Sequence, residues 1–207
     1  MEKNKLSTRA LTGMALMTAV VVILQFLGAF VRFGPFSISL VLIPIVVGAA
    51  LDGPLAGAWF GFVFGLVVLL SGDAGAFMVV NPLGTILTVL LKGSLAGLCA
   101  GFVYRALSHS GKKLQLGGKD KPGVDLAVIA SAIVCPVVNT GIFLLGCLVF
   151  FLPTIRTWAE AMGFENVGSY MILGLVGGNF LFELLFNIIL SPIIVRLIQI
   201  GRNRKAA

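Results

Sequence analysis

The segment 83–107 reads LGTILTVLLKGSLAGLCAGFVYRAL, and Lys92 is its only charged residue before Arg105. A mostly apolar segment of this length exceeds the roughly 20 residues that an α-helix needs to cross the hydrocarbon core of a bilayer. Lys92 lies about ten residues into the segment, roughly 15 Å along a helix axis, and therefore close to the bilayer midplane. The segment predicts a transmembrane helix with an ionisable group near its centre.

The whole chain shares this apolar character. Of its 207 residues, 58% are hydrophobic and only 11% are charged, and the mean hydropathy is +1.08. A soluble domain of this size needs more polar surface, so residues 1–207 are expected to form one all-α integral membrane domain. Six apolar segments are expected to cross the membrane: 10–30, 38–51, 55–70, 83–107, 124–152 and 169–200.

The second predicted span, 38–51, is the shortest and contains Pro44. As a helix it extends only about 21 Å, so it barely crosses a core of roughly 30 Å. The turn Asp52-Gly53-Pro54 separates it from the third span. In the alternative arrangement, a four-span protein, segments 38–51 and 55–70 form a re-entrant pair.

Basic residues are unequally distributed between the two sides that six crossings define. Twelve of the 15 lysines and arginines lie in the N-terminal head, in or beside the linker 108–123, or at the C-terminal end. The opposite loops carry only Arg32 and Arg156. Because cytoplasmic loops are enriched in lysine and arginine, both termini and the linker are expected in the cytoplasm. The net charge of +7 is thus a topology signal and does not indicate nucleic-acid binding.

Small residues recur at every fourth position in three predicted spans. The glycines are at 57, 61 and 65 in the third span and at 93, 97 and 101 in the fourth. Such a pattern permits close helix packing in lipid, and we expect it to act inside the bundle, with an intermolecular interface as the alternative. Ala15 and Ala19 form a similar patch in the first span, for which the residues alone also favour internal packing.

Polar residues occur at membrane depth in the fifth and sixth spans as well. Asn179, Glu183 and Asn187 are four residues apart and share one helix face. Asn139 and Thr140 are expected in the outer half of the fifth span. Ionisable groups at this depth usually face a bundle interior or a water-filled cavity.

These polar groups allow two interpretations. In one, Lys92 and Glu183 form a buried ion pair, and the asparagines hydrogen-bond between helices. In the other, they line a pocket for a small polar solute, with the lysine facing a carboxylate and the amides facing hydroxyl or amide groups. Phe77 is one of several aromatic residues of the outer loops that are candidates to cover such a ligand; the others are Phe33, Phe36, Phe150, Phe151 and Trp158. Taken singly, each of them better suits the aromatic belt at the membrane interface.

The sequence contains no recognisable catalytic, metal-binding or nucleotide-binding motif. The three cysteines lie in apolar stretches without ligand spacing, and the single histidine, His109, lies in a polar linker. We therefore expect no enzymatic activity, no metal and no cofactor. The absence of a Walker sequence means that uphill transport would need an ion gradient or a partner that hydrolyses ATP.

The chain resembles a known family in four features taken together: the six spans, the short second span, the GPLAG turn at 53–57 and the small patch in the first span. That family is the substrate-binding S-component of energy-coupling factor (ECF) vitamin transporters, multi-pass proteins of the bacterial cell membrane. The resemblance covers essentially the whole chain. It implies capture of a vitamin from outside and association with a transmembrane coupling subunit and two ATPases. It also implies that Ala15 and Ala19 contact the coupling subunit.

The segment 43–66, IPIVVGAALDGPLAGAWFGFVFGL, looks most like the pantothenate branch of that family. The Asn81-Pro82 step, Asn139-Thr140 and the Asn179…Glu183 spacing strengthen this likeness. The resemblance implies substrate contacts from Lys92, Asn139, Thr140, Asn179, Glu183, Asn81 and Phe77. Riboflavin, folate or another small solute are the alternative substrates, and a membrane scaffold without transport is the alternative of another class.

Overall fold

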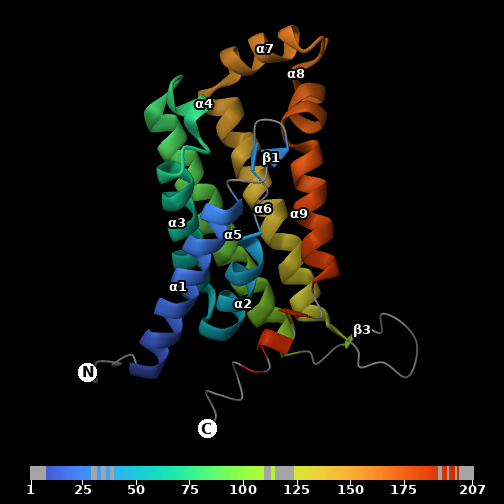
Figure 1. The fold of residues 1–207 in the computed structure, drawn as a ribbon. Coiled ribbons are helices and arrows are strands. Elements are labelled where there is room, and N and C mark those ends of the chain that lie inside the picture. Colours follow the sequence, from blue (N-terminus) through green and yellow to red (C-terminus); the bar gives the residue numbers. More distant parts are fainter. Residues whose placement is uncertain are drawn as a thin grey trace.

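The structure is a computed structural model that describes residues 8–28, 32–33, 36–37, 40–109, 113–114, 124–190, 193–194, 196–198 and 200. Most of the described residues are helical, and the long helices lie alongside one another in a bundle (Figure 1). They are α1 (Thr8–Gly28), α2 (Leu42–Asp52), α3 (Pro54–Leu70), α5 (Pro82–Ser108), α6 (Leu126–Phe150) and α9 (Gly178–Ile189).

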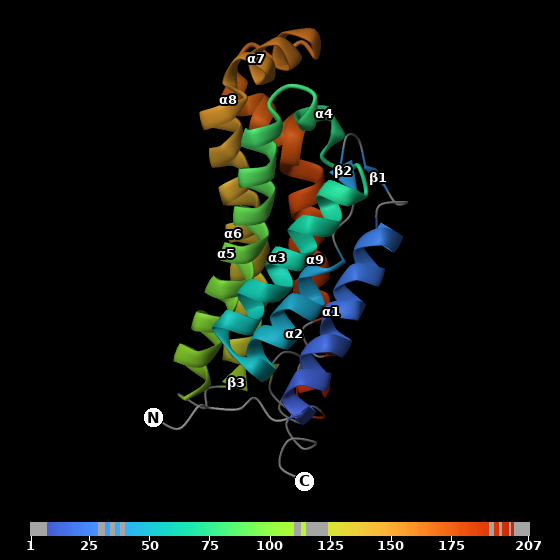
Figure 2. The same cartoon turned by 90° about the vertical axis from the view of Figure 1, so that its left-hand side faces the viewer.

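Short elements connect the helices. The two-residue strands β1 (Arg32–Phe33) and β2 (Phe36–Ser37) pair antiparallel, as do β3 (Lys113–Leu114) and β4 (Val124–Asp125). Two short helices, α4 (Gly75–Met78) and α7 (Leu152–Ala161), lie at one end of the bundle, and α7 crosses that end (Figures 1 and 2). The start of α1 and the end of α5 lie toward the opposite end.

Four helical stretches of the described chain are long and apolar enough to cross a membrane: Leu11–Gly28, Pro82–Ser108, Leu126–Phe150 and Val167–Ile189. They correspond to the predicted spans 10–30, 83–107, 124–152 and 169–200. The predicted helical, multi-pass membrane architecture is therefore confirmed at this level.

The two remaining apolar helices, α2 and α3, are shorter. The 11 residues of α2 extend about 16 Å, roughly half of a hydrocarbon core. Gly53 ends α2 with a φ of 95°, a conformation that side chains other than glycine rarely adopt. Pro54 then occupies the first turn of α3, where its missing N–H costs no hydrogen bond. The predicted span 38–51 thus becomes a helix only from Leu42, and residues 38–39 lie outside the described residues.

Helices α3 and α5 touch through their backbones. Gly57 lies against Gly97 and Gly61 against Gly93, and a Cβ atom on any of the four would overlap a carbonyl oxygen of its partner. These spacings are closer than any pair of larger residues allows. The prediction that the glycine pattern serves packing inside the bundle is confirmed at these four positions.

The last long stretch changes its helical geometry along its length. It begins with α8 (Val167–Ser169), continues as the π-helix η1 (Tyr170–Gly177) and ends as α9. A π-helix turns more slowly than an α-helix and often occurs beside a functional site. Here η1 changes the register immediately before Asn179, so it sets which face of α9 turns toward the bundle. The sequence did not predict this element.

An aromatic cluster packs where α4, α6 and α7 meet. The centroid of the Phe77 ring lies 5.5 Å from that of Phe143, 5.0 Å from that of Phe151 and 5.4 Å from that of Trp158, all in edge-to-face geometry. Such pairs favour a defined arrangement over a loose apolar contact. Of the other predicted covering residues, Phe150 is exposed, and the side chains of Phe33 and Phe36 lie outside the described residues.

Candidate solute-binding site

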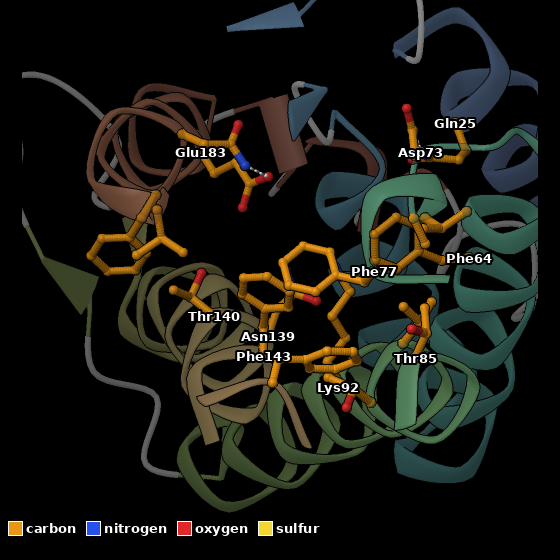
Figure 3. A pocket seen from close by; sticks show the side chains of 18 residues that line it. Gln25, Phe64, Asp73, Phe77, Thr85, Lys92, Asn139, Thr140, Phe143 and Glu183 are labelled. Carbon is orange, nitrogen blue, oxygen red and sulfur yellow. Dashed lines mark hydrogen bonds between the residues drawn. The ribbon is translucent and has the colours of Figure 1, made fainter. Parts of the chain in front are cut away.

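A pocket lies in the half of the bundle that contains α4, between α1, α3, α5, α6 and the η1–α9 stretch (Figure 3). About 70 Å³ of it is open to the centres of water molecules, several times the roughly 10–15 Å³ that one water requires. Five phenylalanines contribute to its lining: Phe64, Phe77, Phe143, Phe151 and Phe180. Nine polar side chains do so as well: Gln25, Asp73, Thr85, Thr88, Lys92, Asn139, Thr140, Asn179 and Glu183.

Lys92 extends from the middle of α5 into this pocket. Its Nζ atom lies 5.6 Å from the centroid of the Phe64 ring and 5.3 Å from that of Phe143. The face of an aromatic ring attracts a cation, most strongly where water is excluded. The two rings thus hold an ammonium group at a depth where lipid would strongly disfavour it.

Glu183 lies across the pocket on α9, and only 2% of its surface is exposed. Its Oε1 atom accepts a hydrogen bond of 3.1 Å from Nδ2 of Asn179, and its backbone carbonyl accepts one of 2.8 Å from Nδ2 of Asn187. These i, i+4 contacts confirm that the three residues share one face of the helix. Asn187 lies one turn beyond the lining residues, so it supports Glu183 without facing the pocket.

Helix α6 contributes Asn139 and Thr140. Asn139 is 5% exposed, and within the described residues its Oδ1 atom has no hydrogen-bond partner. The same is true of Oγ1 of Thr88, which lines the pocket from α5. Buried polar atoms are normally paired, so these two oxygens are unsatisfied acceptors in the wall of the pocket.

Four polar residues of the lining were missed by sequence reasoning: Gln25, Asp73, Thr85 and Thr88. Gln25, near the end of α1, is 1% exposed, and its Nε2 atom donates a hydrogen bond of 2.9 Å to Oδ2 of Asp73, in the turn after α3. An amide inside a predicted span was a usable signal. Its partner was not, because Asp73 lies 48 positions away in a loop.

Three of the proposed functional residues lie elsewhere. Asn81 is not among the pocket-lining residues; it caps α5, where its Oδ1 atom accepts a 2.9 Å hydrogen bond from the backbone N–H of Gly84. Ala15 and Ala19 lie exposed on α1, away from the pocket lining.

The pocket is equipped for binding through charge and hydrogen bonds. It combines one ammonium group, two carboxylates, three amides and hydroxyl groups with aromatic walls, a composition typical of small-molecule sites. Among the described residues, no group of three or more histidine, cysteine, aspartate or glutamate side chains is placed to hold a metal ion.

Comparisons with known proteins agree on one class. A family model described as "ECF transporter, substrate-specific component" matches residues 9–198. The chain is 25% identical over 220 residues to the "Pantothenic acid transporter PanT" of Lactococcus lactis subsp. cremoris (strain MG1363), covering 98% of this chain and 99% of that protein. No solved structure matches the chain significantly.

Proposed function

Since this chain belongs to the family of ECF transporter substrate-specific components, we propose that it captures pantothenate outside the cell for ATP-driven import. The similarity to a pantothenic acid transporter over nearly the full length of both chains supports this substrate. The observation that carries the proposal is Lys92, a cation at membrane depth that faces the pocket.

The chemistry of the pocket suits this substrate. Pantothenate carries a carboxylate at one end and an amide and hydroxyl groups along its length. Lys92 is proposed to bind the carboxylate, because a charge-assisted hydrogen bond is stronger than a neutral one. Asn139, Thr140, Asn179 and Glu183 are proposed to bind the amide and hydroxyl groups, and Phe77 to cover the ligand. For Asn81 the capping contact favours a structural role instead.

We further propose six membrane crossings in one domain, with both termini in the cytoplasm. The second crossing would be completed by the segment before α2, and the third would be α3. The packing of Gly101, near the end of α5, against Pro54 places the α2–α3 turn beside that end of α5. Arg105, in the last turn of α5, lies exposed there, as the enrichment of basic residues on the cytoplasmic side requires. The pocket then opens toward the outside.

For transport, the chain is proposed to associate with a transmembrane coupling subunit and two ATPase subunits. Ala15 and Ala19 are the proposed contact, because both lie exposed on α1 and their small side chains let another helix approach closely.

Thermal unfolding of the purified protein tests the proposed substrate. The panel is pantothenate, riboflavin, folate, thiamine and biotin. A ligand that binds only the folded protein raises the apparent melting temperature by mass action, so a concentration-dependent rise is expected with pantothenate alone. A rise with another vitamin instead would refute pantothenate as the substrate. No rise with any of the five would favour a solute outside the panel or the membrane scaffold.

A further inference from the structure

Two amide–carboxylate pairs lie on opposite sides of the pocket. On one side, Nε2 of Gln25 donates to Oδ2 of Asp73 over 2.9 Å. On the other, Nδ2 of Asn179 donates to Oε1 of Glu183 over 3.1 Å. All four residues line the pocket, the first pair from α1 and the turn after α3, the second pair from α9 (Figure 3).

Each carboxylate fixes the direction of its amide. An ionised carboxylate accepts hydrogen bonds and donates none, so the amide must turn its NH₂ group toward it. The amide oxygen then points away from the carboxylate and can only accept. Within the described residues, Oε1 of Gln25 and Oδ1 of Asn179 are buried and have no hydrogen-bond partner. A buried acceptor in this state lowers stability until a donor reaches it.

We propose that Gln25 and Asn179 are paired acceptors that select a solute with O–H or N–H donors at two separated positions. Asp73 acts as a positioning residue for Gln25, and Glu183, beside its own proposed contact with the solute, positions Asn179; each fixes the orientation of an amide at the pocket wall. This assignment rests on the proposed capture of pantothenate, whose hydroxyl and amide groups supply such donors. It adds α1 to the helices that contact the substrate.

Asn187 provides a matched control within the chain. Its Nδ2 atom is also committed to an acceptor, the backbone carbonyl of Glu183, and within the described residues its buried Oδ1 atom also has no partner. It does not line the pocket. Replacing Asn187 therefore removes the same chemistry from the interior without removing a contact to the solute.

Isothermal titration of the full-length protein with pantothenate tests the proposal. Gln25→Met and Asn179→Leu are each expected to weaken binding about tenfold, the loss of roughly one buried hydrogen bond. Asn187→Leu is expected to leave the affinity unchanged. Asp73→Asn can no longer fix the direction of Gln25, so it is expected to weaken binding less than Gln25→Met does.

Two pantothenate analogues, each with one hydroxyl replaced by hydrogen, test the same contacts without changing the protein. At least one analogue should bind the wild type tenfold more weakly, and its penalty should vanish in the variant that lacks the matching acceptor. Unchanged affinities of Gln25→Met and Asn179→Leu would overturn the acceptor pair while leaving pantothenate capture intact. Failure of the wild type to bind pantothenate would overturn the proposed function, and with it this inference.

Discussion

At the scale of single residues, the pocket is built around a charge that the membrane disfavours. Lys92 is stabilised by two aromatic faces, which compensate only part of the cost of removing an ammonium group from water. An anionic solute bound beside Lys92 would compensate the rest of this desolvation cost. The empty pocket is therefore expected to be the less stable state, and binding to relieve it.

Replacing Lys92 with methionine isolates this contribution, because methionine keeps much of the length of the side chain and removes its charge. Loss of a hydrogen bond to a charged group costs about 1.5–3 kcal/mol, so pantothenate should bind roughly ten- to a hundredfold more weakly. The melting temperature without ligand should not fall, because the variant removes a charge that the membrane interior disfavours. The control is Arg105→Met, at the exposed end of the same helix. Equal affinity in the two variants would exclude Lys92 as a contact.

Lys92 and Glu183, which interrupt apolar segments, were predicted from the sequence, and both line the pocket. The sequence did not identify Gln25, because the importance of that amide depends on Asp73, which only the folded chain brings near. Asn81 shows the opposite difficulty. Its place before a proline suits both a substrate contact and a helix cap, and only the hydrogen bond to Gly84 indicates the cap.

At the scale of helices, α3 and α5 contact each other directly through the backbones of their glycines. The periodic glycines predicted close approach, but the pairing of Gly57 with Gly97 and of Gly61 with Gly93 depends on the register between two helices. The late start of α2, at Leu42, and the π-helix η1 also went unpredicted. Both are set by neighbouring structure, because the local residues would equally suit an ordinary α-helix.

Alanine at Gly61 tests this packing. Its Cβ would overlap the carbonyl oxygen of Gly93, so overpacking should lower the free energy of unfolding by about 1–3 kcal/mol. Gly13→Ala on α1 is the control, since a Cβ there meets no atom within 4 Å. That variant should be neutral or stabilised by up to about 1 kcal/mol, as expected for glycine inside a helix. Similar melting temperatures for the two variants would contradict the close contact.

At the scale of the whole molecule, the pocket and the proposed partner surface occupy different parts of the protein. Helix α1 takes part in both, because Gln25 lines the pocket near its end while Ala15 and Ala19 lie exposed toward its start. The order of the apolar segments was sufficient to predict a helical membrane protein. The number of crossings was not, because the two short helices α2 and α3 suit either a pair of spans or a re-entrant pair.

Ala15→Trp should separate binding from transport. A large side chain at an exposed position leaves the pocket intact, so pantothenate affinity should stay at the wild-type value. Uptake into vesicles that contain the complete importer should fall at least tenfold, because close helix approach is blocked. Leu27→Trp, at an exposed position near the other end of α1, is the control and should transport normally. Uptake by Ala15→Trp at the control rate would place the partner surface elsewhere.

The contact between the backbones of α3 and α5 also indicates which helices around the pocket can move. Two helices that meet without intervening side chains have no rotamers to exchange. Helices α3 and α5 are therefore expected to keep their relative position, and Lys92 lies on α5. Helices α1 and α4 meet their neighbours through side chains, among them Val21 and Gln25 of α1 and Phe77 of α4, and such contacts can rearrange one at a time. A solute would thus enter the pocket by displacing α1 or α4, while α3 and α5 keep their positions.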